Sequence, residues 1–157
     1  MTATAHALVA GAIAAHFGNP VYALPIALTT HFVMDSIPHW DFGTNWRNRP
    51  KTQTGIYAIA ETVFGIALAI ALFHTSVALP LLVATIVVSL LPDWLEAPWY
   101  IFYAKTNKHG LPVRASFLEK FSYAFYKIPN IFHTKAPFPL GIFTQVATVG
   151  FFVTLLH

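Results

Sequence analysis

The sequence contains no cysteine and few charged residues, and each shortage excludes a class of protein. Without cysteine, disulfide bonds and thiolate chemistry are excluded, and any metal ion has to be bound by His, Asp or Glu. Charged residues make up 10% of the 157 residues and hydrophobic residues 56%, whereas a typical soluble domain is about 25% charged. So few charges cannot form the polar shell that a small globule needs in water. The mean hydropathy of +0.59 therefore predicts an integral membrane protein.

Lysine and arginine are absent from the start of the chain. None precedes the first apolar stretch, which argues against a cleaved signal peptide and predicts a helix that stays in the membrane. The net charge of +3 could suit nucleic acid, but the basic residues are scattered near the predicted membrane ends and no groove-reading motif is present. We therefore expect membrane lipids as partners and no nucleic acid.

Five apolar stretches predict an all-α integral membrane protein, a bundle of about five transmembrane helices in a single domain. The stretches cover about 3–17, 21–37, 55–73, 76–91 and 140–156. A helix needs about 20 residues to cross about 30 Å of hydrocarbon. The first two stretches are shorter, so they use polar ends, thin the bilayer locally or enter it only partway.

An aromatic and mildly basic segment, about 105–139, separates the fourth and fifth stretches. Within it, VRASFLEKFSYAFYK places Phe117 and Phe121 against Arg114, Lys120 and Lys127. This pattern is typical of an amphipathic helix that lies in the membrane interface. Such a helix is either an anchor at the level of the head groups or a lid over a site, and the sequence leaves both interpretations open.

The charged residues define one side of the predicted bundle. If the five helices run up and down, all nine Lys and Arg fall on the side of the N-terminus, and all six Asp and Glu fall on or near it. The positive-inside rule makes this side cytoplasmic. We expect a bacterial inner-membrane protein with its N-terminus in the cytoplasm and its C-terminus outside.

The first four helices contain an internal repeat. VYALPIALTTHFVMDSIPHW aligns with SVALPLLVATIVVSLLPDW, which predicts two parallel helical hairpins related by an axis along the membrane normal. The repeats cover about 1–54 and about 55–104, and a last helix at about 140–157 follows the interfacial segment. The alignment places His6 and Glu61 at helix entries on the charged side. It places His39 and Asp93 just past helix exits on the same side.

The stretch HFVMDSIPHWD concentrates metal-binding side chains where the second helix ends. His31 and Asp35 are four residues apart and share one helical face, so one ion can contact both. Pro38 ends the helix, and His39 and Asp41 follow in the loop. Nitrogen and carboxylate ligands suit Zn²⁺ above all, with Mn²⁺ or Fe as alternatives, and a site without thiolate is typical of catalysis.

Ionisable residues inside membrane spans are costly and functional by default. In the alternative interpretation, Asp35 caps backbone groups near Pro38 and Asp41 is a turn residue. In the functional interpretation, the predicted metal ligands are His6, His31, Asp35, His39, Asp41, Asp93 and His133. The candidates for a general base are Glu61 and Glu96.

Three motifs resemble those of the YdjM-like family, inner-membrane proteins described as metal-dependent hydrolases. They are ThrAlaHisAla around His6, the two helix-end sequences LeuProAsp (ending at Asp93) and IleProHisTrpAsp (ending at Asp41), and PheHisThr around His133. The chain departs from the family pattern because Leu95 replaces a second Asp and the later two-histidine motif is incomplete. The pair of His31 and Asp35 also resembles helical His/acid pairs of zinc-dependent phospholipase C enzymes.

Together these features predict metal-dependent hydrolysis at the cytoplasmic membrane face. A phosphoester or lipid-linked substrate would suit the basic residues Arg47, Arg49 and Lys51, although these also simply obey the positive-inside rule. Three alternatives stay open: a non-enzymatic scaffold stabilised by metal, a small transporter, and a metal-free cluster of hydrogen bonds. The sequence indicates neither the substrate nor the oligomeric state.

Overall fold

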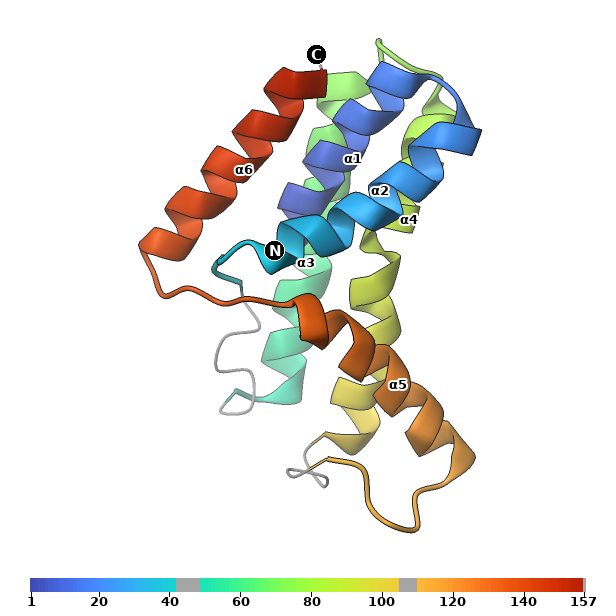
Figure 1. Ribbon diagram of the computed structural model, residues 1–157, viewed down its shortest axis with the longest axis vertical. Coiled ribbons are helices and arrows are strands. Elements are labelled where there is room, and N and C mark those ends of the chain that lie inside the picture. The colour runs from blue at the N-terminus through green and yellow to red at the C-terminus, as the bar shows by residue number, and fades with distance from the viewer. Residues whose placement is uncertain (42–48, 105–109, 157) are drawn as a thin grey trace.

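The computed structural model describes residues 1–41, 49–104 and 110–156, and all regular secondary structure within these ranges is helical (Figure 1). The helices are α1 (Ala3–Phe17), α2 (Pro20–Ser36), α3 (Lys51–Phe73), α4 (Leu79–Pro98), α5 (Phe117–Phe132) and α6 (Leu140–Leu156), and a π-helical segment, η2 (Trp99–Tyr103), continues α4. The predicted all-α class is confirmed. The pairs α1–α2 and α3–α4 are successive hairpins, and their origin as copies of one unit remains a prediction.

The helix α1 lies at the centre of the bundle because its side chains are small. It contacts α2, α3, α4 and α6, and its buried residues are mainly alanines. A Cβ added to Gly65 of α3 would lie 2.7 Å from Thr4 Cα, so the backbones of α1 and α3 meet at this point. Small residues permit this close packing of helices, which is common in membranes.

A tight turn connects α1 to α2. Gly18 ends α1 with a φ of 59°, a left-handed conformation that glycine adopts without strain. The Asn19 side chain then accepts a hydrogen bond from Val21 N at 2.9 Å, and Pro20 occupies the first position of α2. The turn returns α2 alongside α1, so the end of α2 lies near the start of α1 (Figure 1).

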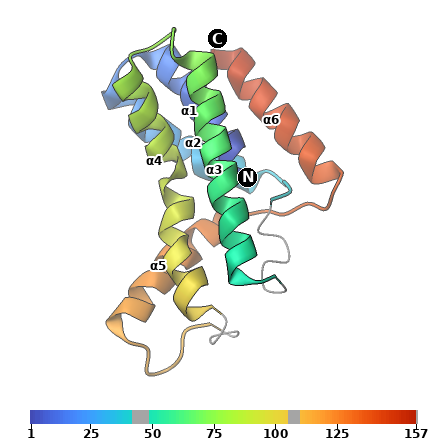
Figure 2. The same cartoon turned by 180° about the vertical axis from the view of Figure 1, so that it is seen from behind.

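The helix α3 and the combined α4–η2 helix are long and apolar enough to cross a membrane, and α1 and α6 are apolar but shorter. Both α3 and α4 continue past the level at which α1 begins (Figures 1 and 2). Large apolar side chains of α3 are exposed, including Ile56, Val63 and Phe64. A contiguous exposed apolar surface marks contact with a membrane or another protein.

The prediction that the fourth helix ends near Leu91 is wrong. The helix continues through Pro92 to Pro98, and η2 carries it to Tyr103. Proline removes one N–H donor and bends a helix, but the hydrogen bonds before and after it can persist. Asp93 therefore lies within α4 and not beyond its end.

The predicted amphipathic helix corresponds to α5. Ser116 and Glu119 form a capping box at its start: Glu119 N donates to Ser116 Oγ at 3.3 Å, and Ser116 N donates to Glu119 Oε2 at 2.8 Å. Phe117, Phe121 and Ile131 are exposed, while other parts of α5 pack on α4 and η2. Its location in a membrane interface remains a prediction.

Replacing Gly141 by alanine should destabilise the protein. A Cβ at this position, near the start of α6, would lie 2.5 Å from Trp40 N and 2.7 Å from Ala136 O. Because backbone atoms cannot move aside cheaply, we expect a loss of about 1–3 kcal/mol. Gly150→Ala on the same helix is the control, since nothing lies within 4 Å of its added Cβ; it should leave stability unchanged or raise it by up to about 1 kcal/mol. Thermal unfolding in detergent, followed by circular dichroism, measures both, and equal unfolding midpoints would contradict the prediction.

Candidate metal centre

Four histidines and two aspartates from distant parts of the chain meet where α1 begins and α2 ends. His6 is on α1, His31 and Asp35 are on α2, His39 follows α2, Asp93 is on α4 and His133 follows α5. Their ligand atoms form two groups, His6, His31 and Asp93 in one and Asp35, His39 and His133 in the other, each with its atoms within 4.8 Å of one another. Both groups could hold a metal ion.

The cluster is arranged around the buried carboxylate of Asp35. His6 Nε2 lies 3.1 Å from its Oδ1, and His31 Nε2 lies 3.4 Å from its Oδ2. His39 Nε2 lies 3.9 Å from Oδ1, and His133 Nδ1 lies 3.7 Å from Oδ2. One carboxylate therefore faces four imidazole rings.

Backbone hydrogen bonds hold the segment after α5 against the end of α2. Thr134 N donates to Asp35 O at 2.9 Å, and His39 N donates to Thr134 O at 3.1 Å. Ala136 N donates to His39 O at 2.8 Å. This short parallel pairing sets His133 beside His39, with their Nε2 atoms 2.8 Å apart.

His39 is held in one tautomer. Its Nδ1 lies 2.8 Å from Ile37 O, and because a carbonyl oxygen can only accept, Nδ1 carries the proton and Nε2 keeps its lone pair. Burial, followed by the positive charge of the Met1 amino group, lowers the pKa of His39 to about 4. The ring is therefore neutral near pH 7, which is the form that binds metal ions, and a carbonyl partner on the other ring nitrogen is usual for metal-binding histidines.

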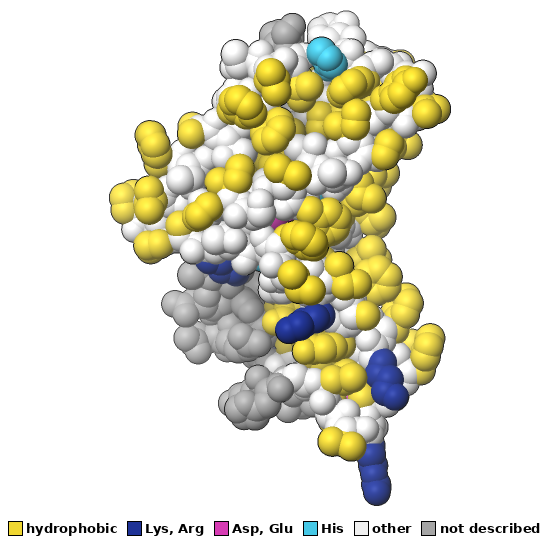
Figure 3. Space-filling view, in the orientation of Figure 1, with side chains coloured by type: hydrophobic (Ala, Val, Ile, Leu, Met, Phe, Trp, Pro, Cys, Tyr) yellow, Lys and Arg dark blue, Asp and Glu magenta, His cyan; other side chains and the backbone are white. Residues whose placement is uncertain are grey.

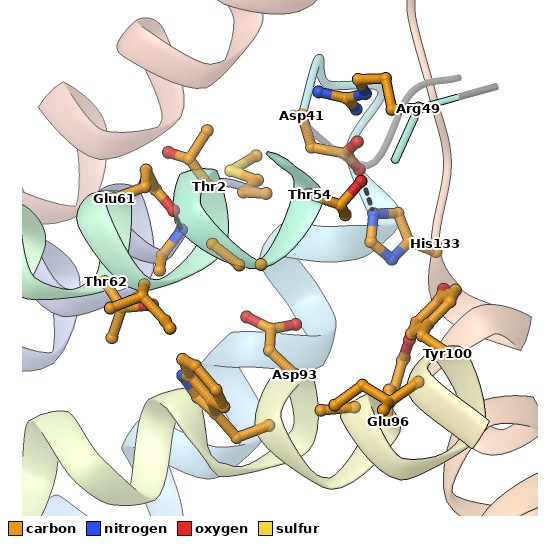
Figure 4. A pocket seen from close by; sticks show the side chains of 18 of the residues that line it. Thr2, Asp41, Arg49, Thr54, Glu61, Thr62, Asp93, Glu96, Tyr100 and His133 are labelled. Atoms are coloured by element: carbon orange, nitrogen blue, oxygen red, sulfur yellow. Dashed lines mark hydrogen bonds and ion pairs between the residues drawn. The ribbon is translucent and has the colours of Figure 1, made fainter. Parts of the chain in front are cut away.

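Asp41 lies at the edge of the second group. Its Oδ2 is 3.0 Å from His133 Nε2 and 3.2 Å from Lys135 Nζ (Figure 4 shows the contact with His133). Burial alone would raise the pKa of Asp41, but the hydrogen bond from His133 and the charge of Lys135 outweigh burial and hold the pKa below its usual range. Asp41 is thus an ionised carboxylate beside the cluster.

A cavity of about 340 Å³ opens beside the cluster, between the parts of α3 and α4 that continue past the start of α1. Asp93 and Glu96 are three residues apart on α4 and both line it (Figure 4). The Asp93 side chain is 30% exposed, so water in the cavity can reach it. Apolar residues, including Ile59, Trp94 and Ile101, form other parts of the wall.

Polar atoms without hydrogen-bond partners are independent evidence that the cluster fits a metal ion. Among the described residues, both ring nitrogens of His31, Nδ1 of His6 and Oδ2 of Asp35 are buried and make no hydrogen bond. His31 Nε2 lies 3.7 Å from Asp93 Oδ1 and near Asp35 Oδ2, within ion-pair distance but outside hydrogen-bond geometry. Unpaired buried polar atoms are rare and costly. The Met1 amino group donates a hydrogen bond to Asp35 Oδ1, so an ion that binds this oxygen has to displace it.

The two candidate general bases have different surroundings. The Glu61 carboxylate accepts hydrogen bonds from Ala3 N at 2.9 Å and Thr4 N at 2.7 Å, so it caps α1 and interacts favourably with the helix dipole. Glu96 lies 3.4 Å from Asn130 Nδ2 through each of its oxygens. Both glutamates line the cavity, but short hydrogen bonds already occupy the carboxylate of Glu61.

All six residues of the two groups are among the predicted ligands, and Asp41, the seventh, contacts the second group. Sequence reasoning missed Asn130 and Lys135, which contact Glu96 and Asp41. No motif or spacing in the sequence marks either of them. Arg47, a predicted head-group contact, lies outside the described residues.

A scan against protein families, a search of curated proteins and a search of solved structures found no match to this chain.

Proposed function

We propose that the chain is a membrane-bound, metal-dependent hydrolase that acts on a phosphoester or lipid-linked substrate at the cytoplasmic face of a bacterial inner membrane. The observation that carries the proposal is the buried histidine–aspartate cluster, with unpaired ligand atoms, beside a cavity. Zn²⁺ is the expected ion because the donors are imidazole nitrogens and carboxylate oxygens, and Mn²⁺ or Fe could use the same donors. The resemblance to the YdjM-like family points the same way and remains a prediction.

The distribution of charge supports a membrane location with the cluster near the cytoplasmic side. We propose five membrane-inserted helices, α1, α2, α3, α4 and α6. In Figure 3, Lys and Arg side chains appear only on the lower half of the visible face, and hydrophobic side chains cover much of the rest. The C-terminus lies at the opposite end (Figure 1). By the positive-inside rule, the basic half faces the cytoplasm.

The cavity supports a substrate with an anionic head and an apolar tail. Arg49, Lys51 and Lys135 line it and can attract a phosphate group. Ile59 and Ile101 line it as well and are largely exposed at the surface of α3 and η2. A lipid could therefore place its head group near the cluster while its chains stay in the bilayer.

The chain's own residues can supply the remaining chemistry. A bound divalent ion makes water a stronger acid and polarises a phosphoryl oxygen. Glu96 takes a proton from the attacking water and returns it to the departing alcohol. Water adds to phosphorus, the P–O bond to the alcohol breaks, and phosphate and alcohol leave. The basic residues of the cavity hold the phosphate during this exchange.

The first test is the metal content of the purified protein in detergent, measured by mass spectrometry after gentle purification and Zn²⁺ resupply. We expect stoichiometric Zn²⁺ in the wild type and a loss of at least one equivalent in His31→Ala. His16→Ala and His74→Ala are matched controls, because both histidines are exposed and lie at the C-terminal ends of α1 and α3, whereas the cluster lies where α1 begins. They should retain all the metal. Wild-type protein without bound metal would refute the proposal.

Turnover separates an enzyme from a scaffold. Zn²⁺-loaded protein should release phosphate from phosphatidic acid in mixed micelles, and more slowly from glycerol phosphate, which has no chains to occupy the apolar wall. Bound metal without turnover of phosphoester lipids would favour the alternative of a metal-stabilised membrane scaffold. A transporter should place its polar groups near the bilayer midplane, and Asp93 lies well inside the α4–η2 helix, so bound metal without turnover would also favour a small transporter.

A further inference from the structure

We infer that the cluster binds two divalent ions, which share Asp35 as a bridging ligand. This inference rests on the metal centre of the proposed function and adds the number of ions and the ligands of each. The first site consists of His6, His31 and Asp93, and the second of His39, His133 and Asp41, with Asp35 completing both.

The six ligand residues are more than one ion needs, and they form two separate groups of three. A tetrahedral Zn²⁺ site takes four ligands, whereas six side chains crowd this region in two separate groups. The first group joins α1, α2 and α4, and the second joins the end of α2 to the segment after α5. Asp35 belongs to the second group and also faces both histidines of the first.

The distances within each site suit coordination. With bonds of about 2.0–2.2 Å, neighbouring ligand atoms of a tetrahedral zinc lie roughly 3.3–3.6 Å apart. In the first site, His6 Nε2 is 3.1 Å from Asp35 Oδ1, and His31 Nε2 is 3.4 Å from the other oxygen, Oδ2. His31 Nε2 is also 3.7 Å from Asp93 Oδ1. These separations differ from the tetrahedral edge by a few tenths of an ångström.

The second site has comparable spacing and a ligand already oriented. Asp41 Oδ2 lies 3.0 Å from His133 Nε2 and 3.8 Å from His39 Nε2. The Nδ1–H of His39 is bonded to Ile37 O, which points the lone pair on Nε2 towards His133 and Asp41. A second ion would therefore be held by His39, His133 and Asp41, none of which belongs to the first site.

Asp35 can bridge because its carboxylate faces histidines of both sites, although the nitrogen of His133 that faces it is Nδ1 and not the Nε2 that faces Asp41. Oδ1 lies 3.1 Å from His6 Nε2 and 3.9 Å from His39 Nε2. Oδ2 lies 3.4 Å from His31 Nε2 and 3.7 Å from His133 Nδ1, and it makes no hydrogen bond among the described residues. Paired ions in hydrolases lie about 3.5–4 Å apart and clamp the attacking and leaving oxygens of one phosphate.

The test counts ions in the full-length protein in detergent. The metal-free protein is titrated with Zn²⁺, and bound metal is measured after removal of the excess. We expect two ions per chain in the wild type, one in His6→Ala, one in His39→Ala and none in Asp35→Ala. His16→Ala and His74→Ala should keep two.

A second measurement needs no variant. Wild-type protein loaded with Mn²⁺ should give the electron paramagnetic resonance spectrum of an exchange-coupled pair, and His39→Ala should give that of a single ion. One ion per chain, or an uncoupled wild-type spectrum, would overturn the two-ion inference and leave the proposed hydrolase standing. No bound ion at all would refute both.

Discussion

Glu96→Gln is expected to lower turnover by on the order of 10²- to 10⁴-fold, the usual contribution of a general base. Glu96 lines the cavity and lies three residues after Asp93 on α4, close to the metal ligands but outside both groups. Glutamine has nearly the same shape and cannot take a proton. The variant should therefore keep its bound Zn²⁺ and its unfolding temperature while phosphate release from phosphatidic acid falls.

Glu61→Gln is the matched control, because Glu61 also lines the cavity but caps α1 through Ala3 N and Thr4 N. The neutral amide should cost about 1 kcal/mol of stability and leave turnover of the folded fraction within a few-fold of the wild type. If Glu61→Gln abolished turnover and Glu96→Gln did not, the base would be Glu61.

The sequence predicted the fold class well because the helices are apolar and their ends carry strong signals. The first and last apolar stretches coincide with α1 and α6, and the second lies within one residue of α2 at each end. The apolar stretch predicts an end of the fourth helix near Leu91, whereas α4 continues through Pro92. Contacts with neighbouring helices can stabilise a helix that bends at a proline, and these contacts cannot be predicted from the sequence alone.

The site was predictable where its residues lie on one helix and less so where they meet through the fold. The spacing of His31 and Asp35 alone places them on one face. His133 reaches the cluster because backbone hydrogen bonds pair Thr134 and Ala136 with the end of α2, and no alternating pattern marks a pairing this short. The capping role of Glu61 was missed for the same reason, since its partners are backbone groups of another helix.

Removal of metal is expected to lower the stability of the protein strongly. At a free Zn²⁺ concentration 1,000 times the dissociation constant, binding to the folded state alone adds about 4 kcal/mol. Chelation withdraws this free energy and leaves His31 and Asp35 Oδ2 buried without partners, each at a cost of about 1–3 kcal/mol. The unfolding midpoint of Zn²⁺-loaded wild type in detergent should fall when a chelator is added and recover when Zn²⁺ is restored.

The same experiment on Asp35→Ala shows whether the effect comes from this site. The variant lacks the carboxylate that faces the four histidines of the cluster. Its unfolding midpoint should therefore be lower from the start and should change little when chelator or Zn²⁺ is added. His74→Ala, which alters an exposed histidine outside the cluster, should respond as the wild type does. An unchanged wild-type midpoint on chelation would mean that hydrogen bonds and ion pairs alone stabilise the cluster, and it would contradict a metal centre. A matching response in Asp35→Ala would place the metal elsewhere in the chain.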